Sequence, residues 1–225
     1  MKLHYLEKRD SKKYHVRLAE NPSDFIAAQK LRYLAFGLCT PSGIDADEFD
    51  QVCTHVLVKK QDTNRVVCCF RLLQLNGGSE IEKSYSALHS YSGKLVEMGR
   101  FCIHPDVKDP DLLRIAWGAL AKYVDQECVE LLFGCASFQG TDATVYLDAF
   151  AMLRDSYLAP KRWFPRVKAQ KVFHFATRLR HKPDMTRALR RMPPLLRSYL
   201  MMGGVGQRSR CGRFANEHTA CLYRH

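Results

Sequence analysis

The chain has 225 residues, of which 46% are hydrophobic, and this is enough for one sizeable domain with its own core. Its 35 Lys and Arg residues outnumber 23 Asp and Glu residues, so its surface suits an acidic protein, an anionic membrane or nucleic acid. It has no run of the roughly 18 apolar residues that a membrane span needs, and its start does not read as a signal peptide. The nine cysteines include no CxxC pair, which argues against a zinc site or a disulfide framework and favours a reduced, cytoplasmic protein.

The first part of the sequence predicts three strands and one helix. An Asn-Pro pair opens a helix over 21–35, in which apolar residues recur at three- and four-residue spacing. A polar loop follows, with four acidic residues among the six at 45–50. The strands are predicted over 14–18, 54–59 and 65–75.

The central segment predicts a strand, a helix and a second strand. Two apolar runs, 95–104 and 131–138, have the length and composition of buried strands. Between them, Asp109 and Pro110 supply a helix N-cap and a first helical residue, and one apolar helix face continues to residue 124.

Two charged residues interrupt the first of these central strands. Glu97 and Arg100 lie in an otherwise apolar pattern, where an unpaired buried charge would cost several kcal/mol. In open α/β sheets, ligands bind outside the carboxyl ends of strands, and this strand ends close to the start of the central helix. The pattern therefore indicates a functional cleft.

The last third of the sequence is basic. Thr141 and Asp142 can cap a helix that runs to Arg154, and 168–178 predicts a further strand before short basic helices. The segment 160–200 has twelve Lys or Arg residues and one acidic residue, so it alone carries a charge of +11. An acidic partner would fit this segment, although a solvated surface is the simpler interpretation.

Several stretches are distinctive enough to carry a family resemblance. They are Glu97-Met-Gly-Arg-Phe-Cys-Ile-His-Pro105, Ala116-Trp-Gly118, Phe133-Gly-Cys-Ala-Ser-Phe-Gln-Gly-Thr-Asp142, Tyr157-Leu-Ala-Pro160 and Met192-Pro-Pro-Leu-Leu-Arg-Ser-Tyr-Leu200. Together they resemble the ornithine N-acyltransferases that begin ornithine-lipid synthesis, a branch of the GNAT fold related to the acyl-homoserine-lactone synthases.

The resemblance implies one GNAT-like acyltransferase domain over 1–204, an α/β fold whose mixed central sheet is flanked by helices. It implies an enzyme that moves a fatty acyl group, typically 3-hydroxylated, from the phosphopantetheine thioester of acyl carrier protein to the α-amine of L-ornithine. The product would be a lyso-ornithine lipid. We expect no metal and no resident cofactor, because the donor carries its own 4′-phosphopantetheine, and a cytoplasmic protein in peripheral contact with the inner membrane face.

Transfer of an acyl group to an amine needs a proton acceptor, donors for the oxyanion and aligned substrates. Glu97 is the expected catalytic proton acceptor, directly or through water, because burial should raise its pKa. The alternative is a structural ion pair with Arg100 or Arg71. Arg100 is the second expected catalytic residue, which a β-bulge permitted by Gly99 would bring beside Glu97, or else it holds the acidic loop.

The acidic loop is expected to bind the substrate amine, as the resemblance to the synthases implies. Asp45, Asp47 and Asp50 would supply carboxylates for the two ammonium groups of ornithine, although acidic loops are more often simply solvated. Arg32 would hold this loop or bind the substrate carboxylate, and Arg71 is assigned to the same substrate site.

A second group of residues is expected to contact the acyl-pantetheine arm. These residues are Phe101, Cys102, Trp117, Ser137 and Phe138. Ser137 would hydrogen-bond the arm, or would simply end a strand. Cys135 is a rival nucleophile, but no base is evident near it and direct transfer needs none. The segment 105–110 replaces the Gly-rich phosphate loop usual in the fold, which makes coenzyme A a weaker donor candidate than a carrier protein.

Residues 205–225 break the family pattern and show no strand alternation. Choosing permitted codons for this tail and reading one base later gives the string WVSDHAVVDSRMNTLHVFTG, which resembles the expected family ending. We therefore interpret the tail as the product of a shifted reading frame. On this interpretation the last strand is missing and a sheet edge is exposed.

Two rival functions remain open. An acyl-homoserine-lactone-type synthase, or an N-acyltransferase for lysine, glycine or glutamine, would share the fold and donor, but the stretches 133–138 and 192–197 favour the lipid branch. A non-enzymatic basic module for membranes or nucleic acid is more remote. Nucleic-acid binding would need aromatic residues interleaved with the basic ones, and Trp163 and Phe164 provide little of that, so we expect no nucleic-acid partner.

Overall fold

The computed structural model describes residues 13–39, 41–77, 88–138, 140, 142–159, 172–206, 210–211 and 217–224. The chain divides into two compact units. Unit 1 comprises Met1–Gln74 and Val96–Val129, and unit 2 comprises Leu75–Leu95 and Glu130–His225. None of the described helices is both long and apolar enough to cross a bilayer.

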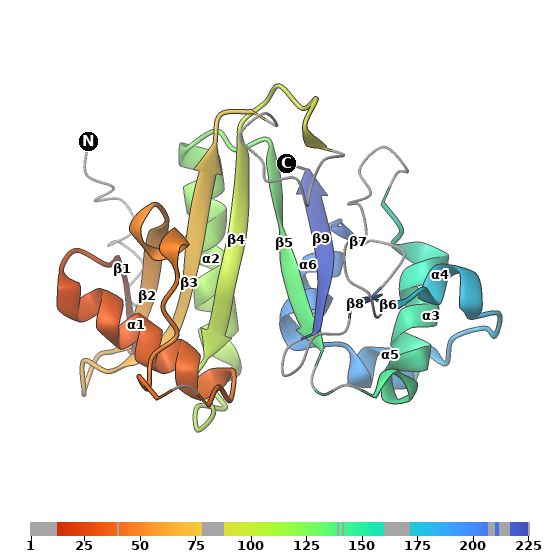
Figure 1. The fold of residues 1–225 in the computed structure, drawn as a ribbon, viewed down its shortest axis with the longest axis horizontal. Coiled ribbons are helices and arrows are strands. Elements are labelled where there is room, and N and C mark those ends of the chain that lie inside the picture. Colours follow the sequence, from red (N-terminus) through yellow and green to blue (C-terminus); the bar gives the residue numbers. More distant parts are fainter. Residues whose placement is uncertain are drawn as a thin grey trace. The chain divides into compact units, whose positions relative to one another are not determined.

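Unit 1 is a sheet with a helix on each face (Figure 1). Its strands follow one another in chain order, and β1–β2 and β2–β3 are antiparallel. The elements are β1 (Tyr14–Leu18), α1 (Pro22–Ala35), the 3-10 helix η2 (Glu48–Gln51), β2 (Thr54–Lys60), β3 (Val66–Leu75), β4 (Leu95–Ile103) and α2 (Pro110–Gln126). Because helices cover both faces, β2 and most of β3 are buried residue after residue instead of alternating.

Both helices of unit 1 begin where the sequence predicts. The Asn21 side chain accepts a hydrogen bond from the backbone N–H of Asp24, and Asp109 accepts one from that of Asp111. Each cap is followed by a proline, whose missing N–H costs nothing in the first turn. The strands and helices predicted for 14–75 and 95–126 are confirmed within a few residues.

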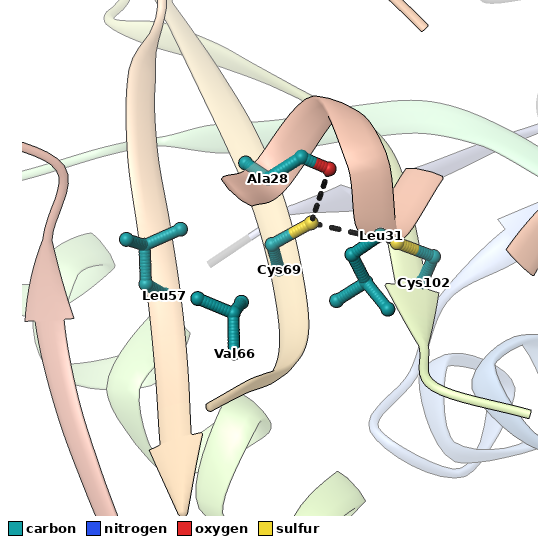
Figure 2. Close-up of a cluster of buried hydrophobic side chains, with 6 residues drawn as sticks. All are labelled: Ala28, Leu31, Leu57, Val66, Cys69 and Cys102. Carbon is teal, nitrogen blue, oxygen red and sulfur yellow. Dashed lines mark hydrogen bonds between the residues drawn. The ribbon is translucent and has the colours of Figure 1, made fainter. Parts of the chain in front are cut away.

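A small apolar cluster joins α1 to the sheet in unit 1 (Figure 2). Its members are Ala28, Leu31, Leu57, Val66, Cys69 and Cys102. The Cys69 thiol lies 3.7 Å from the carbonyl oxygen of Ala28 and 3.4 Å from the Cys102 sulfur, and both thiols are buried. This packing fixes the helix face that also carries Arg32, so it positions the charged residues described below.

Unit 2 contains a second set of paired strands. Strands β5 (Leu131–Phe138) and β9 (Glu217–Arg224) are antiparallel along their whole length, and β7 (Val205–Gly206) and β8 (Arg210–Cys211) also pair with β9. Its remaining elements are the 3-10 helix η5 (Ala143–Tyr146), α3 (Leu147–Ser156), β6 (Val172–Phe173), α4 (Phe175–Arg178), α5 (Met185–Arg191) and α6 (Pro194–Met201). Phe150 is fully buried and packs against Phe138 and Phe175, with ring centroids 4.9 Å and 5.2 Å away.

Two sequence predictions are wrong in unit 2. The last strand is not missing, because residues 217–224 form β9 along β5. The pairing gives the backbone groups of β5 partners on that side, which local alternation in the tail could not reveal. The strand predicted over 168–178 is limited, among the described residues, to β6, and Phe175 starts a short helix because its ring stacks on Phe150.

Candidate active site

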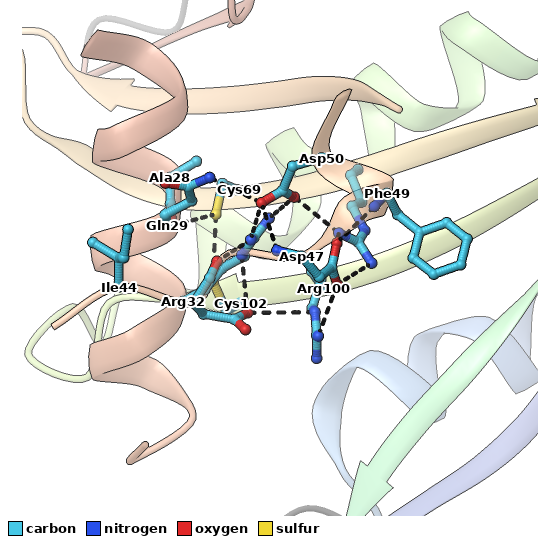
Figure 3. Close-up of polar contacts among 12 residues, drawn as sticks. Ala28, Gln29, Arg32, Ile44, Asp47, Phe49, Asp50, Cys69, Arg100 and Cys102 are labelled. Carbon is cyan, nitrogen blue, oxygen red and sulfur yellow. Dashed lines mark hydrogen bonds and ion pairs between the residues drawn. The ribbon is translucent and has the colours of Figure 1, made fainter. Parts of the chain in front are cut away.

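Six charged side chains gather in unit 1, and we call them the Arg–Asp cluster. Figure 3 labels four of them, Arg32, Asp47, Asp50 and Arg100. They are Arg32, Asp45, Asp47, Asp50, Arg71 and Arg100. The arginines come from α1, β3 and β4, whereas the aspartates come from η2 and the loop before it. The structure brings all six together, and their roles toward a substrate stay predictions.

The inner end of the cluster is a buried bidentate pair. Arg32, 1% exposed, donates from its two terminal nitrogens to the two carboxylate oxygens of Asp50, each at 2.7 Å. Gln29 adds a third hydrogen bond to this carboxylate at 2.9 Å. Burial alone would raise the pKa of Asp50, but these hydrogen bonds outweigh it and hold the pKa well below its usual range. The pair therefore fixes the acidic loop, residues 45–50, to α1.

The outer end of the cluster is more exposed. Asp47 accepts hydrogen bonds from Arg71 at 2.5 Å and 2.9 Å and from Arg100 at 3.0 Å. Arg71 also reaches Asp50, at 2.8 Å, which links the two ends. The Arg100 side chain is 32% exposed, the most open of the three guanidinium groups. Three positive and three negative charges make the cluster neutral as a whole.

Asp45 differs from the other two aspartates in the contacts of its carboxylate. Its Oδ2 lies 3.0 Å from Arg32 Nε and 3.3 Å from Arg100 Nε. Neither contact has hydrogen-bond geometry, and this buried oxygen has no hydrogen-bond partner among the described residues. The Asp45 carboxylate is therefore held by ion pairs with two arginines, and one of these, Arg100, is the most exposed of the three.

Local sequence explains why the acidic segment is ordered. The Asp47 side chain caps η2 by accepting from the N–H of Phe49, and Asp50 Oδ2 accepts in return from the N–H of Asp47. This reciprocal pair is a capping box, which satisfies two backbone donors at once. The loop is therefore held both by its own backbone and by the arginines, and is not merely solvated.

The backbone of β4 is irregular at Arg100. Arg100 has a φ of 54°, in the left-handed region that non-glycine residues seldom adopt. Such a residue turns its side chain out of the regular alternation of a strand, and here the guanidinium reaches Asp45 and Asp47. The irregularity expected at Gly99 is thus found one residue later.

Glu97 is half-buried on the same strand. Its charge acts on the half-buried thiol of Cys53, which also lies close to Arg71 and Asp47. Burial raises the pKa of Cys53 to about 11, Arg71 opposes the increase, and Glu97 adds to it. Glu97 and residues of the Arg–Asp cluster therefore act on the same thiol, and the role predicted for Glu97 stays a prediction.

The residues predicted for the acyl-pantetheine arm divide between the units. In unit 1, Phe101 stacks on Phe70 with ring centroids 5.6 Å apart, Cys102 packs in the core under α1, and Trp117 is half-buried on α2. In unit 2, Ser137 is half-buried, whereas Phe138 is 1% exposed and belongs to the aromatic core around Phe150. This placement favours packing roles for Cys102 and Phe138, and their contacts with a donor stay predictions.

Three residues around the cluster received no role from sequence reasoning. Gln29 lies one helical turn before Arg32 and binds the same carboxylate. The His55 ring bonds to the backbone oxygen of Asp50 at 3.1 Å, and the Phe49 ring lies 5.6 Å from the Arg71 guanidinium carbon. The turn spacing could have indicated Gln29, but the contacts of His55 and Phe49 depend on tertiary folding.

Among the residues that the structure describes, no three His, Cys, Asp or Glu side chains are grouped so that they could hold a metal ion. The carboxylates of the Arg–Asp cluster are instead occupied by guanidinium groups.

Residues 31–118 match the acetyltransferase (GNAT) domain family. The L-ornithine N(alpha)-acyltransferase of Rhodobacter capsulatus is 33% identical over 216 residues, which cover 86% of this chain and 83% of that protein. The chain belongs to the L-ornithine Nα-acyltransferase family. The predicted family is thereby confirmed, and with it the enzyme class of acyltransferase.

Other comparisons agree with this family. A protein of the same name from Brucella abortus is 25% identical and covers 84% of this chain and 76% of its own length. The structure of FeeM, an N-acyl amino acid synthase from uncultured soil microbes, matches 94% of this chain and 90% of that one with a TM-score of 0.53 at 10% identity. At that identity the match shows the fold alone, and it confirms the predicted GNAT-like α/β class.

Proposed function

We propose that this member of the family transfers a fatty acyl group, typically 3-hydroxylated, from acyl carrier protein to the α-amine of L-ornithine and so forms lyso-ornithine lipid. The observation that carries the proposal is the 33% identity to the R. capsulatus protein of that name over 86% of this chain. The Arg–Asp cluster and Glu97 supply charged groups that suit a charged amino-acid acceptor.

In the proposed reaction, Glu97 accepts a proton from the α-ammonium group, directly or through a water molecule. The free amine then attacks the thioester carbonyl carbon, and a C–N bond forms. Collapse of the tetrahedral intermediate breaks the C–S bond and expels the phosphopantetheine sulfur, which leaves as the thiol after taking up the proton that the attacking nitrogen loses. Proton transfer of this kind typically contributes a factor of 10² to 10⁴ in rate.

The outer end of the cluster is the proposed acceptor site. Arg100 has the exposed guanidinium that can bind the carboxylate of ornithine. Asp45, whose carboxylate is ion-paired with Arg100, is the proposed partner of an ammonium group of ornithine. Arg32, Asp50, Asp47 and Arg71 are proposed to hold these two in place.

The start of α2 supports a donor other than coenzyme A. In many phosphate sites, free N–H groups at a helix start bind the phosphate. Here the Asp109 carboxylate takes the N–H of Asp111 at 3.0 Å and also binds Lys13 and Tyr14. The acidic residues Asp109 and Asp111 would repel the several phosphate groups of coenzyme A more strongly than the single phosphate of a carrier protein's phosphopantetheine arm.

We further propose that acyl carrier protein docks on the basic residues Arg162, Arg166, Lys168 and Lys171, which lie outside the described residues. Reversing two of these charges should weaken carrier binding in a salt-sensitive way and leave transfer from a small pantetheine thioester largely unchanged. Equal loss with both donors would contradict the docking role. A cytoplasmic location with peripheral contact at the inner membrane face fits the lipid product.

The function is tested with the purified full-length chain, acyl carrier protein loaded with a 3-hydroxyacyl group, and L-ornithine, lysine, glycine or glutamine as acceptor. Mass spectrometry should detect acyl-ornithine as the main product. Acylation of another amino acid at a higher kcat/KM would contradict the acceptor. In parallel, extracts of cells that express the chain are searched for lyso-ornithine lipid and for acyl-homoserine lactone, and the lactone alone would favour the rival synthase.

The proposed acceptor site is tested by comparing a variant of Asp45 with a control variant of Asp62. Asp45→Asn should raise the KM for ornithine more than tenfold while the KM for the acyl donor changes little, because an ammonium partner is lost. The control is Asp62→Asn, which removes an exposed carboxylate whose ion pair, among the described residues, is with Lys60. Equal KM values for ornithine in the two variants would contradict the role of Asp45.

A further inference from the structure

Helix α5 in unit 2 has a surface that the acyl-transfer chemistry does not use. Among its seven residues only Ala188 is buried, and Met192, which follows it, is also buried. The rest of α5 and the nearby Lys182 are exposed. We call the exposed residues Lys182, Met185, Arg187, Leu189, Arg190 and Arg191 the α5 surface.

The α5 surface is built on a rigid support. Arg154 of α3 donates to the backbone oxygens of Leu179, at 2.6 Å, and His181, at 3.0 Å. Asp148 of α3 accepts from the N–H of Asp184 at 3.1 Å and pairs with Arg187 at 3.4 Å. The segment before α5 and the start of the helix are thus held by α3, so the surface has a defined shape.

The charge of this surface is only partly neutralised within the chain. Arg187 pairs with Asp148 and Asp184. Lys182, Arg190 and Arg191 have no ion pair with any residue in the described part of the chain. From residue 178 to 191 the sequence has six Lys or Arg residues and one acidic residue, so an external anionic partner would gain from the excess of positive charge.

Two large apolar side chains lie on the same helix. Met185 is 51% exposed and Leu189 is 41% exposed. They are four residues apart and therefore neighbours on one side of the helix, whereas Arg187, Arg190 and Arg191 project from the other sides that face solvent. Of the arginines, Arg190 lies nearest to this pair, about 100° from Leu189 around the helix. Apolar residues that can enter the acyl region, with an arginine beside them for phosphate groups, are the arrangement of an interfacial helix.

We propose that the α5 surface docks this protein reversibly on a membrane that contains anionic phospholipid. The proposal rests on the proposed function in one respect, because a lipid product must pass into a bilayer and docking would shorten that path. Lys and Arg residues near an anionic bilayer each contribute attraction, and a single short helix with two apolar residues is too small to anchor the protein permanently. The contact is therefore peripheral and sensitive to salt.

The test is co-sedimentation of the full-length chain with vesicles of phosphatidylcholine containing about 30% phosphatidylglycerol, compared with pure phosphatidylcholine. The double variant Arg190→Glu/Arg191→Glu should bind the anionic vesicles at least about tenfold more weakly. Met185→Ser/Leu189→Ser should weaken the binding that remains at high salt. The matched control Lys30→Glu/Arg114→Glu reverses two exposed charges on α1 and α2 and should bind like the unchanged protein.

Three results would overturn the proposal. Wild-type binding to pure phosphatidylcholine as strong as to anionic vesicles would remove the charge argument. Equal vesicle binding by the Arg190/Arg191 variant and its control, with equal thermal midpoints, would show that the α5 surface does not bind the membrane. Loss of binding to acyl carrier protein with unchanged vesicle binding would assign the surface to the carrier instead.

The outcome is separable from the proposed function by measuring transfer without vesicles. Ornithine acylation with a small pantetheine thioester that carries a short acyl chain should proceed at the wild-type rate in both α5 variants. Normal transfer without vesicle binding would contradict the membrane proposal alone. Vesicle binding without any ornithine acylation would contradict the proposed function and leave the docking surface in place.

Discussion

Glu97 is the side chain whose replacement tests the proposed chemistry most directly. Glu97→Gln keeps the size and shape of the side chain but removes the proton acceptor, so kcat should fall about 10²-fold or more. The fold should be unchanged, as judged by circular dichroism and thermal midpoint. The control Glu48→Gln neutralises an exposed carboxylate in the acidic segment and should keep full activity. A Glu97→Gln enzyme with near-wild-type kcat would exclude the role.

His55 predicts a pH dependence of stability. Burial lowers its pKa below the usual 6.5, and the nearby Arg32 and Arg71 add to this, although the backbone and charge of Asp50 oppose it. Between the folded-state pKa and about 6.5 the unfolded chain therefore binds more protons than the folded one, so stability falls as pH drops below about 6.5. The thermal midpoint should decrease from pH 6.5 to pH 5, and His55→Gln should flatten that decrease. Equal slopes in both proteins would exclude His55 as a cause.

The sequence predicts which residues form the Arg–Asp cluster better than it predicts which of them contact each other. The arginines and aspartates of the cluster could be assigned from their types and from the family resemblance. Which guanidinium meets which carboxylate could not, because Arg32, Arg71 and Asp50 are brought together by three separate elements. The left-handed backbone at Arg100 also has no local signature, since nothing in the sequence favours a positive φ there rather than at Gly99.

At the scale of elements, the pair Arg32–Asp50 ties α1 to η2. Arg32→Met should lower the free energy of unfolding by about 3–5 kcal/mol, because it leaves a buried carboxylate without its main partner. The control Arg114→Met removes an exposed pair with Asp111 and should cost about 1 kcal/mol or less. Urea denaturation measures both. Adding Asp50→Asn to Arg32→Met should recover part of the loss, and a similar cost for the Arg32 and Arg114 changes would contradict the argument.

Elements with strong local signals were predictable, and those that depend on distant partners were not. The starts of α1 and α2 follow from Asn21 and Asp109 together with the prolines after them. The segment around Phe175 was ambiguous, since short apolar runs fit a strand or a helix, and packing on Phe150 decided it. Strand β9 exists through its pairing with β5, a contact between residues 79 to 93 positions apart that local patterns do not encode.

At the scale of the whole molecule, the ending of the chain affects the edge of β5. In the structure β9 pairs with β5 from Leu131 opposite Arg224 to Phe138 opposite Glu217. Removing residues 207–225 would leave the N–H and C=O groups on that side of β5 without these partners and create an edge that can pair with another molecule. The shortened protein should show a lower thermal midpoint and more aggregation by light scattering. Unchanged values would mean that β9 adds little stability.

The hypothesis of a shifted reading frame makes a separate prediction. Replacing residues 205–225 by WVSDHAVVDSRMNTLHVFTG should give a higher thermal midpoint and faster ornithine acylation than the present ending, because its Thr, Val and Phe residues near the end favour a strand. The expected order of stability is the replaced ending, then the present one, then the shortened chain. Sequencing the gene around the codons for Gly203 and Gly204 is the independent control. An intact frame, with equal thermal midpoints and equal rates for the first two proteins, would show that the present ending is the genuine one and that β9 completes the strands of unit 2 as well as the alternative could.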